Sequence, residues 1–261
     1  MKGILLAGGI GSRLFPLTSF TSKQLLPVYD KPLIHYPLST LMLSNIREIL
    51  VITNELHLDK FKQALGNGKQ FGLEIEYKVQ QNPNGIAESL ILGEKFLSGS
   101  KAALILGDNL FHGPGLGRRL ETFSMVQGTQ IFGYKVQDPS AYGVATLDGE
   151  NKIIELAEKP INSDSKVAIP GLYFFDETAP SRAKNLKPSL RGELEILDLL
   201  QDYLDDGLLK LEMLPRGTAW FDSGTFQDLH EASSYVKLMQ ERTGERVGDP
   251  FEIAQHQGWI N

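Results

Sequence analysis

GILLAGGIGSRLFPLTSFTSK, residues 3–23, begins as a short apolar run and then opens into a turn that contains three glycines, Gly8, Gly9 and Gly11. The run predicts a buried strand, and the glycines let backbone amides approach an anion closely, because no Cβ stands in the way. Two cations, Arg13 and Lys23, follow in the same stretch. Any one of these residues is equally typical of a surface turn with solvated charges. Their combination predicts a phosphate-binding loop.

Apolar runs and helical patterns alternate along the first half of the chain. The expected strands after the first are residues 48–53, 73–79 and 102–106, and the expected helices are residues 32–45, 58–65 and 86–96. This order predicts a doubly wound α/β domain with a Rossmann-like, mostly parallel sheet flanked by helices. Ligands of such sheets bind beyond the carboxyl ends of the strands. The glycine turn and Asp108 both follow strand ends, which predicts a site there.

The second half of the sequence contains more strands and fewer helices. We expect strands at residues 130–136, 143–147, 152–157, 171–175 and 210–214, and helices at residues 193–206 and 225–242. These strands are predicted to continue the sheet and to add a small antiparallel lobe, with a sugar-sized cleft between the lobes. Trp259 is expected to pack the tail down. The predicted organisation is one domain, 1–261, with halves at 1–115 and 116–225 and a C-terminal helix and tail at 226–261.

The composition is typical of a globular protein. Of 261 residues, 41% are hydrophobic and 22% are charged, which is enough apolar material for one large core or two unequal ones. The formal net charge of -6 argues against a nucleic-acid partner. The absence of cysteine excludes disulfides, thiolate metal sites and a cysteine nucleophile. The first apolar run is too short for a membrane span or a signal peptide, so we expect a cytoplasmic protein without a membrane partner.

Two common phosphate-binding motifs that contain a glycine-rich turn do not match this sequence. A dinucleotide fingerprint needs G-x-G-x-x-G, but the sixth residue counted from Gly9 is Leu14. A P-loop needs Gly-Lys-Ser/Thr, which the Arg13-Leu14 sequence cannot supply. A nucleoside triphosphate loop remains, in which Arg13 offers a planar fork of donors and Lys23 a mobile point charge.

Two aspartates are candidate metal ligands. Asp108 lies in Gly-Asp-Asn after a strand, and Asp222 lies between an apolar approach and a glycine turn before a helix. Carboxylates together with substrate phosphates are typical magnesium ligands, although a turn cap or a helix N-cap explains either residue alone. Glu158-Lys159, Tyr142-Gly143 and Arg191-Gly192-Glu193 are weak signals one by one, the last being typical of a helix start. The histidines show no metal-binding spacing.

Taken in order, the motifs resemble one family. They are LLAGGIGSRLFPLT, SKQLLPVYDKPLIHYPLSTLMLSNIREILVIT, FGLEIEYKVQ, PNGIA, LILGDNLF, DPSAYGVA, EKP, GLYFFD, KPSLRGELEI and AWFDSGT. Over nearly the whole chain they resemble the glucose-1-phosphate thymidylyltransferases, also called dTDP-glucose pyrophosphorylases, of the sugar nucleotidyltransferase family. The resemblance implies the nucleotidyltransferase fold with a small antiparallel sugar-binding lobe. It also implies attack of the phosphate of glucose 1-phosphate on the α-phosphorus of dTTP, with Mg²⁺ as cofactor.

The resemblance also assigns the site residues. Nucleotide binding falls to Leu6, Gly8, Gly9, Gly11, Ser12, Arg13, Lys23, Gln80, Gly85 and Asp108. Sugar-phosphate binding falls to Asn109, Tyr142, Gly143, Glu158, Lys159 and Arg191. The resemblance implies Asp108 and Asp222 as the metal ligands. It implies a catalytic set of Arg13, Lys23, Asp108 and Lys159.

Several alternatives stay open at this point. Relatives continue beyond the position of Asn261 into helices that build subunit contacts and a second nucleotide site, and the resemblance implies a homo-oligomer, a dimer or a tetramer. A preference for UTP or for another sugar 1-phosphate cannot be separated from the leading interpretation, because one hydroxyl or methyl is read by pocket shape. A non-catalytic nucleotide-sugar sensor is the alternative from another class, although a sensor has little need for two metal acids.

Overall fold

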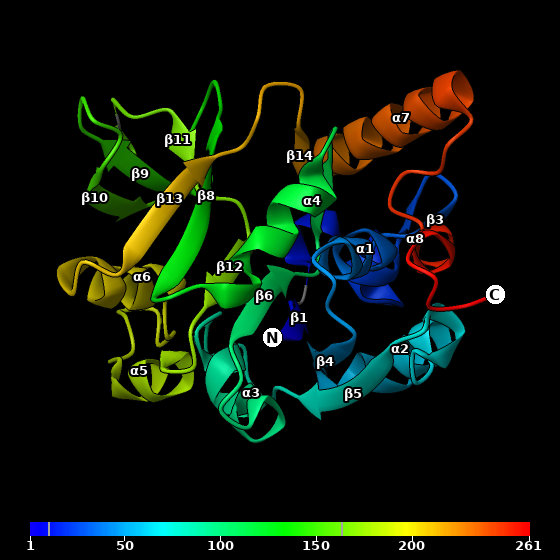
Figure 1. The fold of residues 1–261 in the computed structure, drawn as a ribbon, viewed down its shortest axis with the longest axis horizontal. Helices are drawn as coiled ribbons and strands as arrows, with labels where there is room; N and C mark the ends of the chain where they lie inside the picture. Colours follow the sequence, from blue (N-terminus) through cyan, green and yellow to red (C-terminus); the bar gives the residue numbers. More distant parts are fainter. Residues whose placement is uncertain (10, 163) are drawn as a thin grey trace. The chain divides into compact units, whose positions relative to one another are not determined.

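The computed structural model describes residues 1–9, 11–162 and 164–261. The chain divides into two compact units that interleave in sequence (Figure 1). Unit 1 contains residues 1, 84–104 and 125–216, and unit 2 contains residues 2–83, 105–124 and 217–261. Neither unit is therefore a continuous piece of the chain.

Unit 2 is built on a parallel sheet. β1 (Lys2–Ala7) pairs with β4 (Glu48–Thr53), and β4 pairs with β5 (Glu74–Val79), both in parallel. β1 and β4 are almost continuously apolar and buried, as expected for parallel strands that are covered on both faces. The carboxyl ends of the three strands lie at one edge of this sheet, so the glycine turn after Ala7 and the loop after Val79 leave from the same edge.

Helices and two short hairpin-like pairs complete unit 2. Its helices are α1 (His35–Leu43), α2 (Leu58–Leu65), α4 (Leu116–Glu121), α7 (Phe226–Thr243) and α8 (Pro250–His256). β2 (Pro27–Val28) pairs with β3 (Lys31–Pro32), and β7 (Asn109–His112) pairs antiparallel with β14 (Ala219–Asp222). We call the β7–β14 pair the ribbon. One apolar cluster joins α1, α7 and the ribbon through Val28, Leu33, Tyr36, Leu110, Ala232, Val236 and Val247.

Unit 1 is centred on β8 (Thr129–Lys135). β8 pairs in parallel with β13 (Leu209–Met213) and antiparallel with β11 (Val167–Ala168) and β12 (Leu172–Phe175). β9 (Gly143–Leu147), β10 (Ile153–Glu158) and β11 form the small antiparallel lobe that the sequence predicts. The helices are α3 (Glu88–Leu97), α5 (Ala179–Asn185) and α6 (Ile196–Asp205), and α3 packs on α5.

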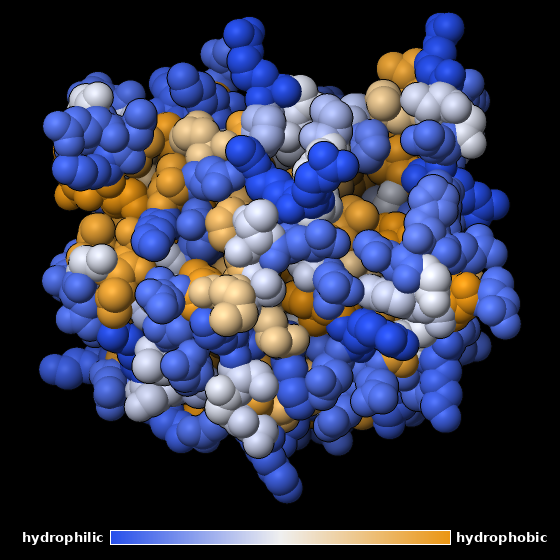
Figure 2. Space-filling view, in the orientation of Figure 1, coloured by the Kyte–Doolittle hydropathy of each residue, from blue (hydrophilic) through white to orange (hydrophobic). Residues whose placement is uncertain are grey.

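The remaining regular elements are β6 and short 3-10 helices. β6 (Ala102–Leu106) begins in unit 1 and ends in unit 2. The 3-10 helices are η1 (Ser12–Leu14), η2 (Leu17–Ser19), η3 (Lys23–Leu25), η4 (Glu55–His57), η5 (Lys69–Phe71) and η6 (Thr122–Met125). Among the described residues, no helix has both the length and the apolar character needed to cross a bilayer. The face shown in Figure 2 is mostly hydrophilic, with smaller apolar areas between the charged side chains.

Most predicted elements are confirmed, but three helix starts are wrong. The helix expected from residue 86 begins at Glu88. The helix expected from Pro32 begins at His35, because Lys31–Pro32 pairs with β2 as a strand. The helix expected from Glu193 begins at Ile196, because Leu194 uses its backbone groups in bonds to another loop. The sequence analysis also missed the ribbon and α4, α5 and α8. α8 had a readable signal, since Asp249 caps it with Pro250 in its first turn.

The predicted packing of the tail is confirmed. The guanidinium carbon of Arg47 lies 5.2 Å from the centroid of the Trp259 ring, a cation–π arrangement. A Cβ built on Gly72, whose φ is +67°, would lie 2.6 Å from the Trp259 Cβ. Glycine at this position therefore lets the indole-bearing tail close on the end of η5.

Gly85 shows how one loop of unit 1 depends on a close backbone approach. The Leu194 N–H donates to the Asn84 carbonyl at 2.6 Å, and the Ala87 N–H donates to the Leu194 carbonyl at 3.2 Å. Gly85, between these two bonds, has φ +104°, and a Cβ built there would lie 2.3 Å from the Leu194 oxygen. Two backbones thus meet where only glycine fits, because neither can turn aside as a side chain would.

We expect Gly85→Ala to lower the free energy of unfolding by about 2–5 kcal/mol, from backbone strain plus the clash with Leu194. Gly99→Ala is the matched control, because Gly99 also has a positive φ, +77°, but nothing lies within 4 Å of its built Cβ. Its expected cost is about 1–2 kcal/mol. Urea unfolding followed by circular dichroism measures both, and equal costs would contradict the role given to Leu194.

Candidate active site

The ribbon of unit 2 brings the two candidate metal acids together. Asp108 immediately precedes β7, and Asp222 is the last residue of β14, where it lies opposite Asn109 in the antiparallel register. The Ser223 N–H donates to the Asp108 carbonyl at 3.1 Å, which continues the pairing past the strand end. Two carboxylates far apart in sequence are therefore neighbours because of one short strand pair.

Asp108 is held ionised by its surroundings. Lys23, the first residue of η3, donates from Nζ to Asp108 Oδ2, and each of the two side chains is only 12% exposed. The Asn109 Nδ2 donates to Asp108 Oδ1 at 2.9 Å. Burial would raise the pKa of Asp108, but the Lys23 ammonium and these hydrogen bonds outweigh burial and hold the pKa below its usual value. The sequence analysis named both residues but did not predict that Lys23 and Asp108 pair directly.

Asp222 is shifted in the opposite direction. Burial raises its pKa to about 6, the neighbouring Asp108 charge adds to this rise, and Lys23 and Arg13 oppose it. The pair therefore carries more negative charge than its two cations offset. Hard carboxylate oxygens in such a place fit a divalent cation. No group of three or more His, Cys, Asp or Glu side chains suited to a metal occurs in the described part of the chain, so other ligands would be water or substrate oxygens.

The glycine loop positions Arg13 and Lys23 beside the two aspartates. Gly11 has φ +68°, and a Cβ built on it would lie 3.1 Å from the Lys23 Cβ. η1 begins at Ser12 and carries the exposed Arg13, whose Nη2 lies 2.8 Å from a Cβ built on Gly224. Since Gly224 follows Asp222 closely in sequence, Arg13 lies beside the turn that carries that acid. Ile10, within the same loop, lies outside the described residues.

The other predicted nucleotide residues of unit 2 lie at the carboxyl edge of its sheet. Gln80 follows β5 and is 7% exposed, and its Oε1 lies 2.9 Å from a Cβ built on Gly8. The Leu6 carbonyl accepts the Gly107 N–H at 2.8 Å. Gly9 has no atom closer than 3.8 Å to its built Cβ, the nearest being side-chain atoms of Gln24 and Lys23. The edge thus gathers the predicted residues of unit 2, whereas Gly85 belongs to unit 1.

Gln24 was missed by the sequence analysis. It is 3% exposed, it bonds to the Ser22 hydroxyl through Oε1, and its Cγ lies 3.0 Å from a Cβ built on Gly107. It therefore fills the space between the glycine loop and the loop before Asp108. The only available signal was a polar residue directly after Lys23, which is too common to interpret alone.

A second group of predicted residues meets in unit 1. In the β9–β10 pair Glu158 lies opposite Gly143, and the Lys159 N–H donates to the Tyr142 carbonyl at 2.9 Å. The Lys159 ammonium lies 2.9 Å from Glu158 Oε1. Arg191 Nη2 lies 3.9 Å from the same oxygen and 2.9 Å from Glu195 Oε1, and the Glu195 bond and charge raise the pKa of Arg191. Two exposed cations and an acid thus share one surface, as expected for a phosphate-bearing sugar.

Two simpler explanations of the aspartates fail. Thr225, not Asp222, caps α7, in a capping box with Asp228. The Asp108 carboxylate binds side chains of Lys23 and Asn109 rather than serving only as a turn cap. Asn109, predicted for the sugar phosphate, lies in unit 2 and is 2% exposed.

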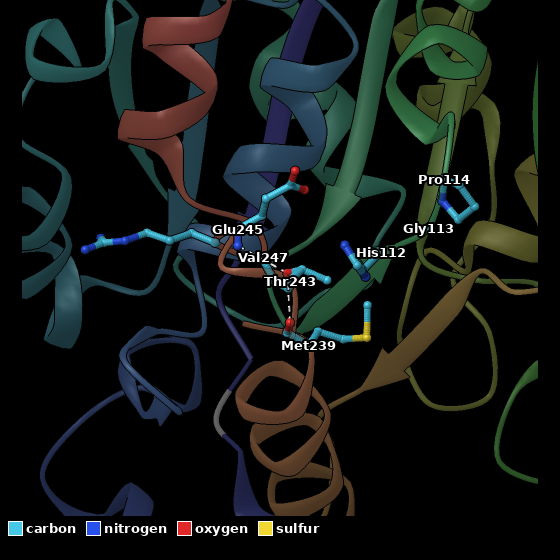
Figure 3. A pocket seen from close by; sticks show the side chains of 8 residues that line it. His112, Gly113, Pro114, Met239, Thr243, Glu245 and Val247 are labelled. Atoms are coloured by element: carbon cyan, nitrogen blue, oxygen red, sulfur yellow. Dashed lines mark hydrogen bonds between the residues drawn. The ribbon is translucent and has the colours of Figure 1, made fainter. Parts of the chain in front are cut away.

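A cavity of about 330 Å³ lies elsewhere in unit 2, between the end of β7 and the C-terminal end of α7. His112, Gly113 and Pro114 line one side, and Met239, Thr243 and Val247 are among the residues on the other (Figure 3). The Thr243 hydroxyl donates to the Met239 carbonyl at 2.8 Å. None of the predicted site residues lines this cavity.

Comparisons with known proteins identify the family of this chain. A family profile described as Nucleotidyl transferase matches residues 2–238. The glucose-1-phosphate thymidylyltransferase of Xanthomonas campestris pv. campestris (strain B100) is 52% identical over 261 residues, which are 100% of this chain and 88% of the relative. That of Mycolicibacterium smegmatis (strain ATCC 700084 / mc(2)155) is 50% identical and covers 100% of this chain and 91% of its own.

Solved structures give the same result for the fold. A Bacillus anthracis crystal structure, assigned as a glucose-1-phosphate thymidylyltransferase and bound to sucrose, has a TM-score of 0.86 and 37% identity, covering 97% of this chain and 99% of its own. A UDP-glucose pyrophosphorylase has a TM-score of 0.79 at 22% identity, over 91% of this chain and 98% of its own, which bears on the fold alone. The predicted mixed, mostly parallel sheet with flanking helices is confirmed. Members of this family generally use a divalent metal. The chain belongs to the nucleotidyl transferase family and, by its full-length matches, to the glucose-1-phosphate thymidylyltransferases within it.

Proposed function

We propose that this chain transfers a thymidylyl group from dTTP to glucose 1-phosphate and so forms dTDP-glucose and pyrophosphate. The observation that carries the proposal is the cluster of Asp108, Asp222, Lys23 and Arg13 at the end of the glycine loop. An acid pair whose charge two cations only partly offset, beside a glycine turn, suits a divalent cation and a nucleoside triphosphate. The names of the full-length relatives supply the substrates.

The reaction needs no nucleophile from the protein. A phosphate oxygen of glucose 1-phosphate forms the new bond to the α-phosphorus of dTTP, and the bond from that phosphorus to the β-phosphate oxygen breaks. Pyrophosphate leaves with the bonding electron pair, in line with the attack. Catalysis of such a transfer depends on positioning and on neutralising phosphate charge. Both tasks match a site made of backbone amides and cations.

On this proposal, each cluster binds one substrate. Backbone amides of Gly8, Gly9, Gly11 and Ser12, with Arg13 and Lys23, hold the triphosphate, and Leu6, Gln80 and Gly85 contact the nucleoside, the last two reading the thymine edge. In unit 1, Lys159 and Arg191 hold the phosphate of the sugar phosphate, Glu158 accepts from its hydroxyls, and Tyr142 and Gly143 line the site. Lys159 and Glu158 are already paired, so the acid orients the ammonium before substrate arrives.

We further propose Mg²⁺ as the metal, held by Asp108 and Asp222. When bound, it would neutralise charge on the phosphate oxygens that the triphosphate presents. Lys23 keeps Asp108 ionised and oriented, whereas Asp222 retains a raised pKa until positive charge arrives. Asp108 thus offers an ionised carboxylate in a fixed orientation, whereas the ionised form of Asp222 is favoured when a cation binds beside it.

Pyrophosphate release from purified protein tests the reaction. With Mg²⁺, we expect dTTP and glucose 1-phosphate to give the highest rate in a panel of dTTP, UTP and other nucleotides crossed with several sugar 1-phosphates. The thymine methyl group and the deoxyribose distinguish dTTP from UTP, and each change of this size is worth about tenfold or more in rate. A higher rate with UTP would make the protein a uridylyltransferase instead. Nucleotide binding without any turnover would favour the non-catalytic nucleotide-sugar sensor.

The two acids should differ in stability although both are needed for turnover. The pKa of Asp222 is raised to about 6 in the folded protein, so its ionisation destabilises the fold above that pH and has no effect below about pH 4. We therefore expect Asp222→Asn to stabilise the metal-free protein at pH 7.5 by on the order of 1–3 kcal/mol. Asp108, with its pKa lowered, contributes stability above about pH 4, so Asp108→Asn should destabilise the protein and leave Lys23 without its carboxylate.

Urea unfolding in EDTA at pH 7.5 and pH 4 measures both variants, and the Asp222→Asn difference should vanish at the lower pH. Pyrophosphate release should fall by about 100-fold or more in each, because one carboxylate ligand of the proposed metal is lost. Unchanged turnover in Asp108→Asn would remove that residue from the site. Destabilisation by Asp222→Asn would contradict the repulsion between the acids.

Lys159→Gln tests the sugar-phosphate cluster. We expect KM for glucose 1-phosphate to rise by about 10–100-fold, the value of a charge-assisted hydrogen bond, while KM for dTTP changes by less than about twofold. Lys152→Gln is the matched control, because Lys152 pairs with Glu150 in the open, with side-chain exposures of 73% and 75%. Steady-state kinetics with each substrate varied measures the effect. A rise confined to KM for dTTP would show that Lys159 binds the nucleotide rather than glucose 1-phosphate.

A further inference from the structure

The side chain of Asn109 connects Asp108 to an aromatic residue of the opposite strand. Its Nδ2 donates to Asp108 Oδ1 at 2.9 Å, and its Oδ1 accepts from the Trp220 indole Nε1 at 2.7 Å. All three residues are buried, with exposures of 9% for Asp108, 2% for Asn109 and 9% for Trp220. An indole, an amide and a carboxylate therefore form one line of hydrogen bonds inside unit 2.

The ribbon explains why these side chains meet. Asp222 lies opposite Asn109, and Trp220 lies opposite Phe111. Alternate residues of a strand share a face, so Trp220, Asp222 and Asn109 lie on one face of the ribbon. The indole reaches Asn109 along the diagonal between the two strands, a distance that a long aromatic side chain can span. β14 thus carries both Asp222 and Trp220, and the Trp220 indole holds Asn109 beside Asp108.

The chemistry of the three groups allows only one orientation of the amide. An indole N–H can only donate, so the amide oxygen must face Trp220. An ionised carboxylate can only accept, so the amide nitrogen must face Asp108. Reversing the amide would break both bonds at once. Trp220 therefore determines which end of Asn109 points at the carboxylate.

This line of bonds completes the orientation of Asp108. Lys23 binds Oδ2 and Asn109 binds Oδ1, so both oxygens and hence the plane of the carboxylate are fixed. A hydrogen bond from its own backbone also reaches the Asp108 carboxylate and adds to this orientation. A carboxylate fixed before a cation arrives loses little conformational freedom on binding it.

We infer that Trp220 and Asn109 are positioning residues for Asp108, which they orient through its carboxylate. The inference rests on the proposed function for its kinetic consequence only. The hydrogen-bond line itself can be observed in protein without substrate.

The first test follows the two indole N–H signals in a ¹H–¹⁵N spectrum, since the chain has two tryptophans. Trp220→Phe and Trp259→Phe assign the signals. In Asn109→Ala we expect the Trp220 signal to move upfield and its hydrogen to exchange faster, while the Trp259 signal stays in place. An unmoved Trp220 signal would overturn the indole-to-amide bond.

The second test measures Mn²⁺ affinity in the presence of dTTP, from the free-ion signal in electron paramagnetic resonance. We expect Trp220→Phe and Asn109→Ala each to weaken Mn²⁺ binding by about 5–20-fold, the effect of one lost buried hydrogen bond. Trp259→Phe is the matched control, because Trp259 packs on Arg47 and Gly72 and contacts none of these residues. Unchanged Mn²⁺ affinity in both variants would overturn the positioning role.

Kinetics separate this role from sugar binding. We expect the two variants to lower kcat and to raise the Mg²⁺ concentration at half-maximal rate by about 5–20-fold, with KM for glucose 1-phosphate within about twofold. A tenfold rise in that KM with normal Mn²⁺ affinity would make Asn109 a sugar ligand instead. If wild-type protein released no pyrophosphate, the proposed function would fail, while the indole and Mn²⁺ results would still decide the positioning role. Trp220→Phe keeps an aromatic ring but removes the N–H donor together with part of the indole volume, and Asn109→Ala provides the second variant if it does not fold.

Discussion

The repulsion between Asp108 and Asp222 is the interaction on which the site of unit 2 depends. Two carboxylates are placed side by side by a short strand pair, and the chain offsets only part of their charge with Lys23 and Arg13. The result is asymmetric, since the pKa of one acid is lowered and that of the other is raised. Such a site has an unmet demand for positive charge, which the proposed metal cation would supply. Stability is thereby exchanged for binding, as is common where residues are arranged for function.

The glycines of this chain show that the proposed phosphate loop is shaped by its protein neighbours. Gly8 lies against Gln80, Gly11 against Lys23, and Gly107 against Gln24, all through side-chain atoms. Gly85 is different, since it faces the backbone of Leu194. Absence of a Cβ therefore has two uses here. It leaves amides open to an anion, and it lets the surrounding loops close to within van der Waals distance.

Elements with a clear period were predictable from the sequence, and pairings between distant short segments were not. β4, β6, β9 and α2 were predicted with their observed ends, because each is a long enough apolar or amphipathic run with a breaker beside it. The ribbon was missed, because four-residue strands carry too little pattern and their register depends on contacts across the chain. For this reason Asp108 and Asp222 were identified as acids of interest, whereas the role of Trp220 required the register of the ribbon.

The interleaved order of unit 2 has a consequence for how the protein is synthesised. Its β7 strand is translated long before β14, the only strand that β7 pairs with among the described residues. Until residue 222 emerges from the ribosome, β7 has unsatisfied main-chain groups of the kind that recruit other chains into aggregates. Only four residues are exposed in this way, since β7 comprises Asn109–His112. A short strand thus limits the surface over which a nascent chain is vulnerable, and Asp108 and Asp222 come together only after residue 222 has been made.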